Sequence, residues 1–529
     1  MRHLGRGSVG RHGAPSLRAR LASLGETYPR LRWAAFIGIF AVGIAVRAVR
    51  IGEWPIGFRP TLDYDSANAT RTIYLTLTTS HPSGWQQVWL QTHPGRFLEP
   101  PILQTLTALT YLPDGIERPR TAVVFTTVAW LVASALLFST IRRLTDWSGS
   151  LLGLAYILLA PFGVAMSQSF QPEPLVLLSL STVIWYAMRG DVLSGRRFAV
   201  AALIGALAGL TKPGTLLFFI AAVYVVSAWQ GGSLLDRRRL ARLAVLLALT
   251  ALPAIVYALV WIPNQVDSKI LPQLWISRSF YVGWGKNVLR AAGAIPLLGA
   301  GLGYVLTRRL WPLGIGLGVA YLGYSATFPY HAMTHDYYQL PLLLMVAIGL
   351  GGLGSALAKI VQRCSFRRGL AIAAALGVAV VLTFALAPRN LYETPPGTFP
   401  DAPRFEAIGQ RLGAGEQVLT YSPNYGKPLM YYGKLLVTFW PNAGDEKFYK
   451  IMGLPGETAE SRLADFITTV NPHYFVITVD PGGIPALVAF LEARYALVQS
   501  DTNLRIYDLT RPLQPGIPSA TVNPALAAP

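Results

Sequence analysis

The feature that most constrains the fold is a series of eleven long apolar blocks. A helix needs about 20 apolar residues to cross roughly 30 Å of hydrocarbon. Only 13% of the residues are charged, whereas a typical soluble protein has about 25%. The sequence therefore predicts an all-α polytopic membrane bundle with about 11 transmembrane helices. The blocks are residues 33–51, 121–141, 150–168, 172–189, 198–211, 214–229, 243–262, 288–306, 311–328, 337–358 and 370–387.

Basic residues are distributed unevenly between the segments that join these blocks. If the N-terminus is cytoplasmic, the pairs Arg142-Arg143, Arg196-Arg197 and Arg308-Arg309 all fall on the inner side. Cytoplasmic loops are enriched in Lys and Arg, so we expect residues 1–32 inside and the C-terminal part outside a plasma or inner membrane. This placement accounts for the net charge of +19 without nucleic acid as a partner. The single cysteine, Cys364, excludes an internal disulfide.

The chain is expected to divide into a transmembrane domain, residues 33–387, and a small extracytoplasmic α/β domain, residues 388–510. In the first outer loop, residues 52–120, a helix is predicted over 66–77 with Asp65 as its N-cap, and a membrane-surface helix over 100–112. The stretch 263–287 reads as an outer loop suited to lipid headgroups. The Pro- and Ala-rich tail, 511–529, predicts disorder, and no internal repeat is visible. In the α/β domain the patterns predict helices at 404–412, 459–470 and 484–494, and strands at 417–421, 474–479 and 504–509.

Ionisable residues gather at the predicted outer boundary of the membrane. Charges at this depth are costly, so a cluster of them indicates a functional site. Five separated segments, around Asp65, Glu99, Glu173, Lys212 and His335, deliver such residues to one face, which a purely structural protein does not need. The candidates are Arg47, Asp63, Asp65, Glu99, Glu173, Lys212, Arg290, His331 and His335, with Tyr337 beside the last histidine.

The acidic candidates each admit two interpretations. Asp63 or Asp65 could act as general base toward an acceptor hydroxyl, or cap a helix. Glu99 precedes two prolines and is held in an extended conformation, yet it could belong to an ordinary turn. Glu173 could orient a substrate or a metal, or simply stabilise the first turn of its helix.

The cationic candidates are similarly open. Lys212 could neutralise a phosphate, or extend along the membrane toward water. His331 and His335 have the i, i+4 spacing that can hold a divalent metal, but only one carboxylate is adjacent and no third histidine lies nearby. Hydrogen bonding to a phosphate or sugar is favoured over metal binding, and no other cofactor is expected.

Four segments resemble the glycosyltransferase C superfamily. They are Asp65-Ser66 ahead of a short helix, Leu98-Glu99-Pro100-Pro101-Ile102, Thr211-Lys212-Pro213, and the run from His335 to Pro341. Within the superfamily, the chain is most similar to protein O-mannosyltransferases and bacterial lipid A aminoarabinose transferases, over roughly residues 33–387. Ser66 departs from the pattern, because an acidic residue is usual there.

The resemblance implies the glycosyltransferase C fold and an inverting transfer of a hexose or pentose from a polyprenyl-phosphate donor at the outer face. The acceptor would be a lipid, glycan or protein in the cell envelope. Asp65, or else Asp63, would be the base, and cations would assist the departing lipid phosphate. The candidate cations are Lys212, Arg290, Arg47, His331 and His335. The resemblance implies that substrate is also bound by Glu99, Glu173 and Tyr337.

The alternative function is a membrane transporter or lipid flippase. Transporters place coupling carboxylates near the bilayer midplane and often contain inverted repeats. The apolar blocks here contain almost no acidic residues. This distribution favours the transferase.

Overall fold

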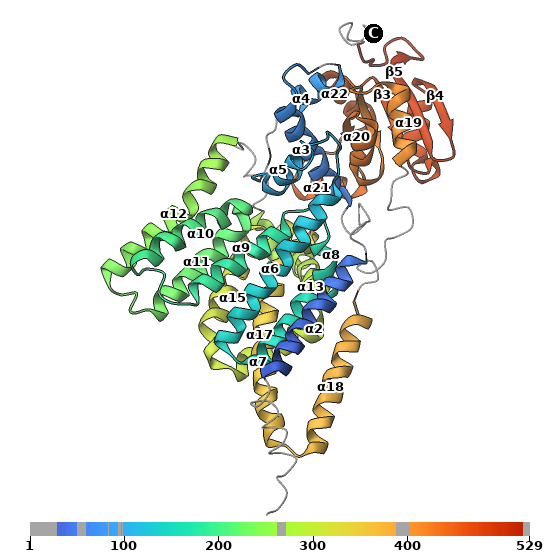
Figure 1. The fold of residues 1–529 in the computed structure, drawn as a ribbon. Coiled ribbons are helices and arrows are strands. Elements are labelled where there is room, and N and C mark those ends of the chain that lie inside the picture. The colour runs from blue at the N-terminus through green and yellow to red at the C-terminus, as the bar shows by residue number, and fades with distance from the viewer. Residues whose placement is uncertain are drawn as a thin grey trace, which may run out of the picture. The chain divides into compact units, whose positions relative to one another are not determined.

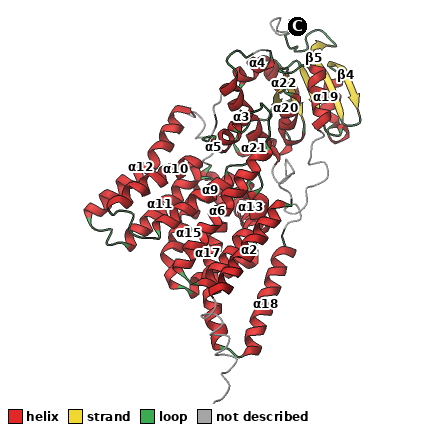
Figure 2. Cartoon of the chain, in the orientation of Figure 1, coloured by secondary structure: helices red, strands yellow, loops and turns green. Residues whose placement is uncertain are grey.

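The computed structural model describes residues 29–49, 60–82, 84–93, 97, 99–261, 271–387 and 402–521. Helices dominate, and one small sheet lies near the C-terminus (Figure 1, Figure 2). The chain forms two compact units, each treated separately below. Unit 1 comprises Met1–Arg50, Thr127–Ser167 and Glu173–Tyr392, and unit 2 comprises Ile51–Thr126, Gln168–Pro172 and Glu393–Pro529.

Every predicted apolar block is helical over most of the residues that the structure describes, which confirms the fold class. By length and composition, five helices among the described residues could cross a membrane, or up to seven if each of two bent pairs is one span. The predicted number of about 11 therefore holds for apolar helical segments rather than for full-length spans. The helices are α2 (Pro29–Ala48), α6 (Arg120–Leu144), α7 (Trp147–Leu159), α8 (Pro161–Ser167), α9 (Glu173–Ala187), α10 (Gly195–Thr211), α11 (Pro213–Gln230), α12 (Arg237–Trp261), α13 (Arg278–Ala292), α14 (Ala294–Leu306), α15 (Trp311–Thr327), α17 (Leu340–Arg363) and α18 (Phe366–Ala385).

The two bent pairs are α7 with α8, at 58°, and α13 with α14, at 85°. Helix α13 corrects the prediction of an outer loop over 263–287, because the chain is helical from Arg278 onward. Its buried residues Phe280, Asn287 and Ala291 recur at helical spacing, a pattern that the surrounding aromatic and basic residues obscure. Residues 262–270 of that predicted loop lie outside the described part of the chain.

Helix α17 forms the core of unit 1. Helix α17 belongs to the candidate membrane span Asp336–Arg363, and 83% of an apolar 18-residue stretch of this span is buried. This is the highest buried share among the candidate spans of the described residues. The helix packs backbone to backbone on its neighbours: a Cβ at Gly149 of α7 would collide with the carbonyl of Gly351, and one at Gly303 of α14 with that of Gly349. Small residues at such contacts let membrane helices approach closely.

Two hairpin turns have the same local structure, a short repeat that the sequence analysis did not predict. The stretch 190–197, where α9 turns into α10, and the stretch 232–239, where α11 turns into α12, have identical residues at four of eight positions at an offset of 42. Gly190 and Gly232 both have φ 155°. The guanidinium group of Arg197 lies against Gly190, and that of Arg239 lies against Gly232. Arg197 donates to the carbonyl of Tyr186 at 2.7 Å, and Arg239 donates to that of Ala228 at 2.5 Å.

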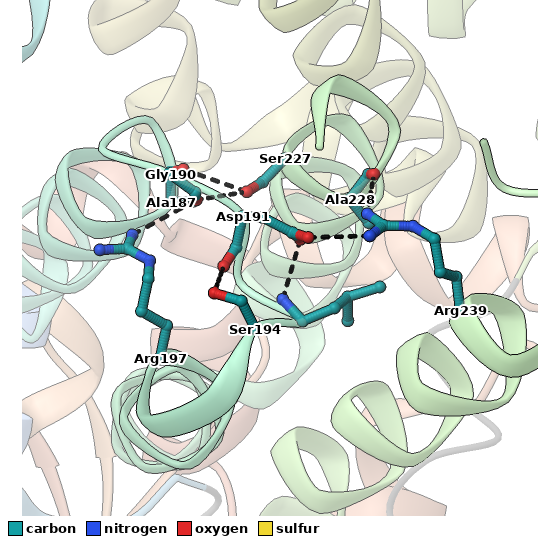
Figure 3. A network of polar contacts seen from close by, with 9 residues as sticks. Ala187, Gly190, Asp191, Ser194, Arg197, Ser227, Ala228 and Arg239 are labelled. Carbon is teal, nitrogen blue, oxygen red and sulfur yellow. Dashed lines mark hydrogen bonds and ion pairs between the residues drawn. The ribbon is translucent and has the colours of Figure 1, made fainter. Parts of the chain in front are cut away.

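The two turns are joined by polar contacts around Asp191 (Figure 3). The Oδ2 atom of Asp191 lies 2.8 Å from Nη1 of Arg239. The hydroxyl of Ser227 donates to the carbonyls of Ala187 and Gly190, at 3.1 Å each. Hydrogen bonds and charge therefore fasten one hairpin turn to the other.

Unit 2 contains a five-stranded sheet with strand order β2-β1-β3-β5-β4. Strand β1 is parallel to β2 and β3, and β5 is antiparallel to β3 and β4. All three predicted strands and all three predicted helices of this domain are present. Sequence reading missed the short elements α20, α21, β2 and β4. The elements are α19 (Ala402–Leu412), β1 (Gln417–Tyr421), α20 (Lys427–Gly433), β2 (Leu436–Phe439), α21 (Ala443–Ile451), α22 (Ala459–Thr469), β3 (Tyr474–Ile477), α23 (Pro485–Glu492), β4 (Tyr495–Asp501) and β5 (Leu504–Pro512).

The chain after β5 packs on this domain as far as residue 521, which differs from the disorder expected from 511. Tyr495 donates from its hydroxyl to the carbonyl of Pro518 at 2.6 Å, and Ala520 is buried. Asn471 donates to the carbonyl of Thr521 at 2.8 Å. Composition alone did not reveal these long-range contacts, and residues 522–529 lie outside the description.

The first loop belongs to unit 2 with the C-terminal domain, whereas we had expected it with the transmembrane domain. It contains α3 (Pro60–Thr78), α4 (Trp85–Thr92) and α5 (Ile102–Leu109). Helix α5 confirms the predicted short apolar helix. Helix α3 begins at Pro60, so Asp65 lies inside it and the predicted N-cap is wrong. Proline favours the first helical position because its φ is preset and its missing N–H is not needed there.

Candidate functional site

The two aspartates of α3 have different surroundings. Asp63 is only 1% exposed, and its Oδ1 accepts the backbone N–H of Phe170 at 2.9 Å. The side-chain amide of Gln171 lies 3.5 Å from the same oxygen. Asp63 therefore binds the segment Gln168–Pro172, which joins α8 to α9 along the chain.

Asp65 is the accessible carboxylate of this helix. Its side chain is 44% exposed, and its Oδ1 lies 2.8 Å from Nζ of Lys427 at the start of α20. No sequence signal pointed to Lys427, because it lies far along the chain on a helix that was not predicted.

An extensive interface holds α20 against α3. Arg71 of α3 makes a bidentate pair with Glu117, with both distances 2.8 Å, and donates to the carbonyl of Tyr431 at 2.7 Å. Its guanidinium also lies 4.4 Å from the centre of the Tyr431 ring. Burial lowers the pKa of Arg71, but the charge and hydrogen bonds of Glu117 outweigh it and raise that pKa. Arg71 is therefore a permanent charge that fixes α20 in place.

The other candidates of the first loop lie around α5. Glu99 is half-buried in the turn that precedes this helix. Ser66, where the resembled superfamily has an acidic residue, lies 3.3 Å from the side-chain amide of Gln104 on α5. The serine therefore takes part in packing α3 against α5.

In unit 1, Glu173 and Lys212 form a buried ion pair. Oε1 of Glu173 lies 2.6 Å from Nζ of Lys212, which excludes the interpretation of Lys212 as a residue extended toward water. The ammonium also lies 5.2 Å from the ring centre of Tyr337 and 5.1 Å from that of Tyr338. The cavity here measures about 10 Å³, roughly the space for one water molecule. Aromatic faces and a carboxylate thus surround one desolvated cation.

The side chains of His331 and His335, which are four residues apart in the sequence, contact each other. The rings of His331 and His335 stack at 5.6 Å, and Tyr338 lies 4.9 Å from His331. Nδ1 of His335 is 2.7 Å from the hydroxyl of Thr334. Among the described residues there is no group of three or more His, Cys, Asp or Glu side chains that could hold a metal. Two histidines without a third protein ligand do not fit a zinc-type site.

Arg290 forms an ion pair with the buried carboxylate of Asp336 at 2.8 Å. It also lines a cavity of about 140 Å³ with Tyr156 and Pro296. An apolar cavity of about 180 Å³ shares these last two residues and extends between α7, α14, α17 and α18. The arginine therefore lies at one end of a largely apolar space.

Arg47, another predicted phosphate ligand, is buried among helices of unit 1. It donates to the hydroxyl of Ser167 at 2.7 Å and to the carbonyls of Gly43 and Leu158 at 2.9 and 2.8 Å. These bonds join α2 to α7 and α8. The geometry favours a structural role for Arg47 over phosphate binding.

Residues 99–261 match the family of dolichyl-phosphate-mannose-protein mannosyltransferases. A comparison with the curated proteins found no match.

Two solved structures have the same fold over most of the chain. One is ArnT from Cupriavidus metallidurans bound to undecaprenyl phosphate, which is 14% identical with a TM-score of 0.53, covering 92% of this chain and 99% of that chain. The other is the Archaeoglobus fulgidus oligosaccharyltransferase tethered with an acceptor peptide, which is 13% identical with a TM-score of 0.54, covering 91% of this chain and 74% of that one. The chain therefore has the predicted glycosyltransferase C fold.

Proposed function

We propose that this chain, a membrane protein of the glycosyltransferase C fold, transfers a sugar from a polyprenyl-phosphate donor to an acceptor hydroxyl. The match of residues 99–261 to a dolichyl-phosphate-mannose family supports a lipid-phosphate donor. So does the fold, which the chain shares with an ArnT structure that contains undecaprenyl phosphate. The observation that carries the proposal is the half-exposed carboxylate of Asp65 on α3, whose Oδ1 is held by Lys427.

Asp65 is the better candidate for the base than Asp63. A general base must come within hydrogen-bond reach of the proton that it takes. Asp63 is enclosed and accepts a backbone N–H, so its oxygen is already used to hold Phe170. Asp65 has the exposure that an acceptor needs.

In the transfer step, one bond forms at the anomeric carbon of the sugar and one bond breaks there. The acceptor hydroxyl gives its proton to Asp65 while its oxygen attacks the anomeric carbon of the sugar. The bond from that carbon to the phosphate oxygen breaks, and its electron pair stays on the lipid phosphate. Attack opposite the leaving group inverts the anomeric configuration.

Cations would stabilise the phosphate as its charge develops. Lys212 and Arg290 are the candidates, and each is paired with a carboxylate, Glu173 or Asp336. A lipid phosphate would compete with that carboxylate for the cation. His331, His335 and Tyr337 would contribute hydrogen bonds, and the apolar cavity beside Arg290 suits a lipid chain.

We further propose the topology expected from the charges, with the N-terminus in the cytoplasm and unit 2 outside a plasma or inner membrane. The donor sugar would be a hexose or a pentose. The acceptor would be a lipid, glycan or protein of the cell envelope.

The test uses purified protein in proteoliposomes with polyprenyl phosphates that carry a labelled hexose or pentose, and an envelope extract as the source of acceptors. The proposal predicts loss of label from at least one donor, with free polyprenyl phosphate as the second product. Movement of intact donor across the bilayer without cleavage of the sugar–phosphate bond would support a flippase instead.

A further inference from the structure

We propose that Lys427 is a positioning residue that the C-terminal domain contributes to the catalytic carboxylate. Its role would be to hold Asp65 by Oδ1 so that Oδ2 is presented to the acceptor hydroxyl. This inference rests on the proposed function, because it assigns a role to a neighbour of the proposed base. It also gives the C-terminal domain a part in catalysis.

The contact itself is direct. Nζ of Lys427 lies 2.8 Å from Oδ1 of Asp65, and the lysine side chain is 28% exposed. Charge-assisted hydrogen bonds of this length are stronger and more directional than neutral ones. The carboxylate is therefore restrained in orientation while it remains open to solvent.

The backbone before Lys427 is unusual. Asn424, Tyr425 and Gly426 have φ values of 54°, 57° and 70°, three successive left-handed residues. Residues other than glycine adopt this conformation only where surrounding contacts impose it, and such residues cluster at functional sites. The conformation turns the chain sharply from the end of β1 into α20.

Contacts on both sides stabilise this turn. The hydroxyl of Thr61 on α3 donates to Oδ1 of Asn424 at 3.0 Å. The hydroxyl of Tyr425 donates to Asp445 at 3.1 Å. A Cβ at Gly426 would come within 2.7 Å of Val437 Cγ1, so only glycine fits there. The turn is thus held between α3 and the sheet, with Lys427 as the next residue.

The rest of α20 is fixed in the same way. The hydroxyls of Tyr64 and Tyr432 lie 3.4 Å apart, and Arg71 binds the carbonyl of Tyr431. Because both ends of the Asp65–Lys427 pair belong to a rigid interface, the pair has the preorganised geometry that catalysis needs.

The alternative is an ordinary surface ion pair. Exposed pairs usually contribute little to stability, so a purely structural Lys427 would leave both stability and turnover unchanged on removal. The two interpretations therefore predict different kcat values for a variant that lacks the Lys427 ammonium.

Lys434, the residue directly after α20, offers a matched control. It is also a lysine at an end of this helix, but its ammonium lies over the Trp85 ring at 5.2 Å rather than on a carboxylate. Lys427→Met and Lys434→Met remove the same charge from opposite ends of one short helix. Lys427→Arg keeps a cation that can reach Asp65.

The experiment measures kcat and the KM for donor with the labelled donor that the wild type consumes fastest, together with thermal unfolding. We expect Lys427→Met to lower kcat by at least about tenfold, since misplacing a catalytic group costs up to roughly a hundredfold. The donor KM and the unfolding temperature should not change, Lys427→Arg should recover most of the rate, and Lys434→Met should match the wild type.

A Lys427→Met variant within about twofold of the wild-type kcat would overturn the inference. So would an equal loss in Lys434→Met, or a loss in Lys427→Met that merely follows a lower unfolding temperature. Failure of the proposed function looks different: the wild type would consume no donor, or Asp65→Asn would retain full activity. If Asp65→Asn is inactive while Lys427→Met is normal, only the inference about Lys427 is wrong.

Discussion

Oε1 of Glu173 and Nζ of Lys212 lie 2.6 Å apart, and both side chains are buried within the helices of unit 1. Glu173 begins α9 and Lys212 lies between α10 and α11. The pair therefore joins the start of α9 to the junction of α10 and α11, and the cation proposed to meet a phosphate is neutralised by a carboxylate in the same molecule.

Breaking this pair from one side should destabilise the protein strongly. Removing one partner of a buried ion pair leaves an uncompensated charge and costs about 3–5 kcal/mol. We expect Glu173→Gln and Lys212→Met each to lower the unfolding temperature in detergent, and the double variant to be more stable than either single variant. A double variant that shows the simple sum of the two losses would contradict this account.

Asp63 should behave as a structural residue. Its removal leaves the backbone N–H of Phe170 without its acceptor in a buried place, which costs about 1–3 kcal/mol. We expect Asp63→Ala to lower the unfolding temperature, with transfer activity per folded molecule reduced much less than in Asp65→Asn. Calorimetry and activity on the folded fraction measure the two effects. An Asp63→Ala variant with wild-type stability and no activity would instead make Asp63 the base.

The contact between the two repeated turns predicts a pH dependence. Burial raises the pKa of Asp191, but hydrogen bonds from Arg239 and the Leu193 N–H, with the charge of Arg239, outweigh burial and lower that pKa. A lowered folded-state pKa gives stability that is present above the unfolded value, about 3.9, and is lost as pH falls through the folded value.

The stability difference between wild type and Asp191→Asn should therefore be largest near neutral pH and disappear in acid. Its size should be at most about 1 kcal/mol, because the pair is partly solvated. Unfolding curves across the acid range measure it. A difference that grows as the pH falls would have the wrong sign.

The single cysteine tests the proposed topology. Cys364 is partly exposed between α17 and α18, in a segment expected to be cytoplasmic. A membrane-impermeant maleimide should label it in whole cells only after permeabilisation. In a Cys364→Ser background, Glu457→Cys on unit 2 should be labelled without permeabilisation. Reversed labelling of the two positions would invert the topology.

Features that depend on neighbouring residues could be predicted from the sequence, whereas features that depend on contacts between distant segments could not. Periodicity and apolar length are local, so the helical blocks and the strands at 417–421 and 474–479 could be predicted from neighbouring residues alone, although the second strand ends at Ile477. The N-cap at Asp65 was wrong because Pro60 starts the helix one and a half turns earlier. Helix α20 was missed because it has only seven residues.

The candidate site was predictable only as a set of residues. The motifs pointed to Asp65, Lys212 and His335, but their partners depend on contacts between distant segments. Lys427 beside Asp65 and Glu173 beside Lys212 are such contacts. The repeat was not predicted because it covers only the short stretches 190–197 and 232–239, although four of these eight positions are identical and their hydrogen bonds correspond.

The most direct test of the account compares wild type and Asp65→Asn in proteoliposomes that contain labelled polyprenyl-phosphate sugar and envelope acceptors. A general base typically contributes about a hundredfold to ten-thousandfold in rate. The account predicts that Asp65→Asn folds with wild-type stability, still binds the donor, and loses at least about a hundredfold of the transfer rate. Transfer by Asp65→Asn at the wild-type rate would contradict it.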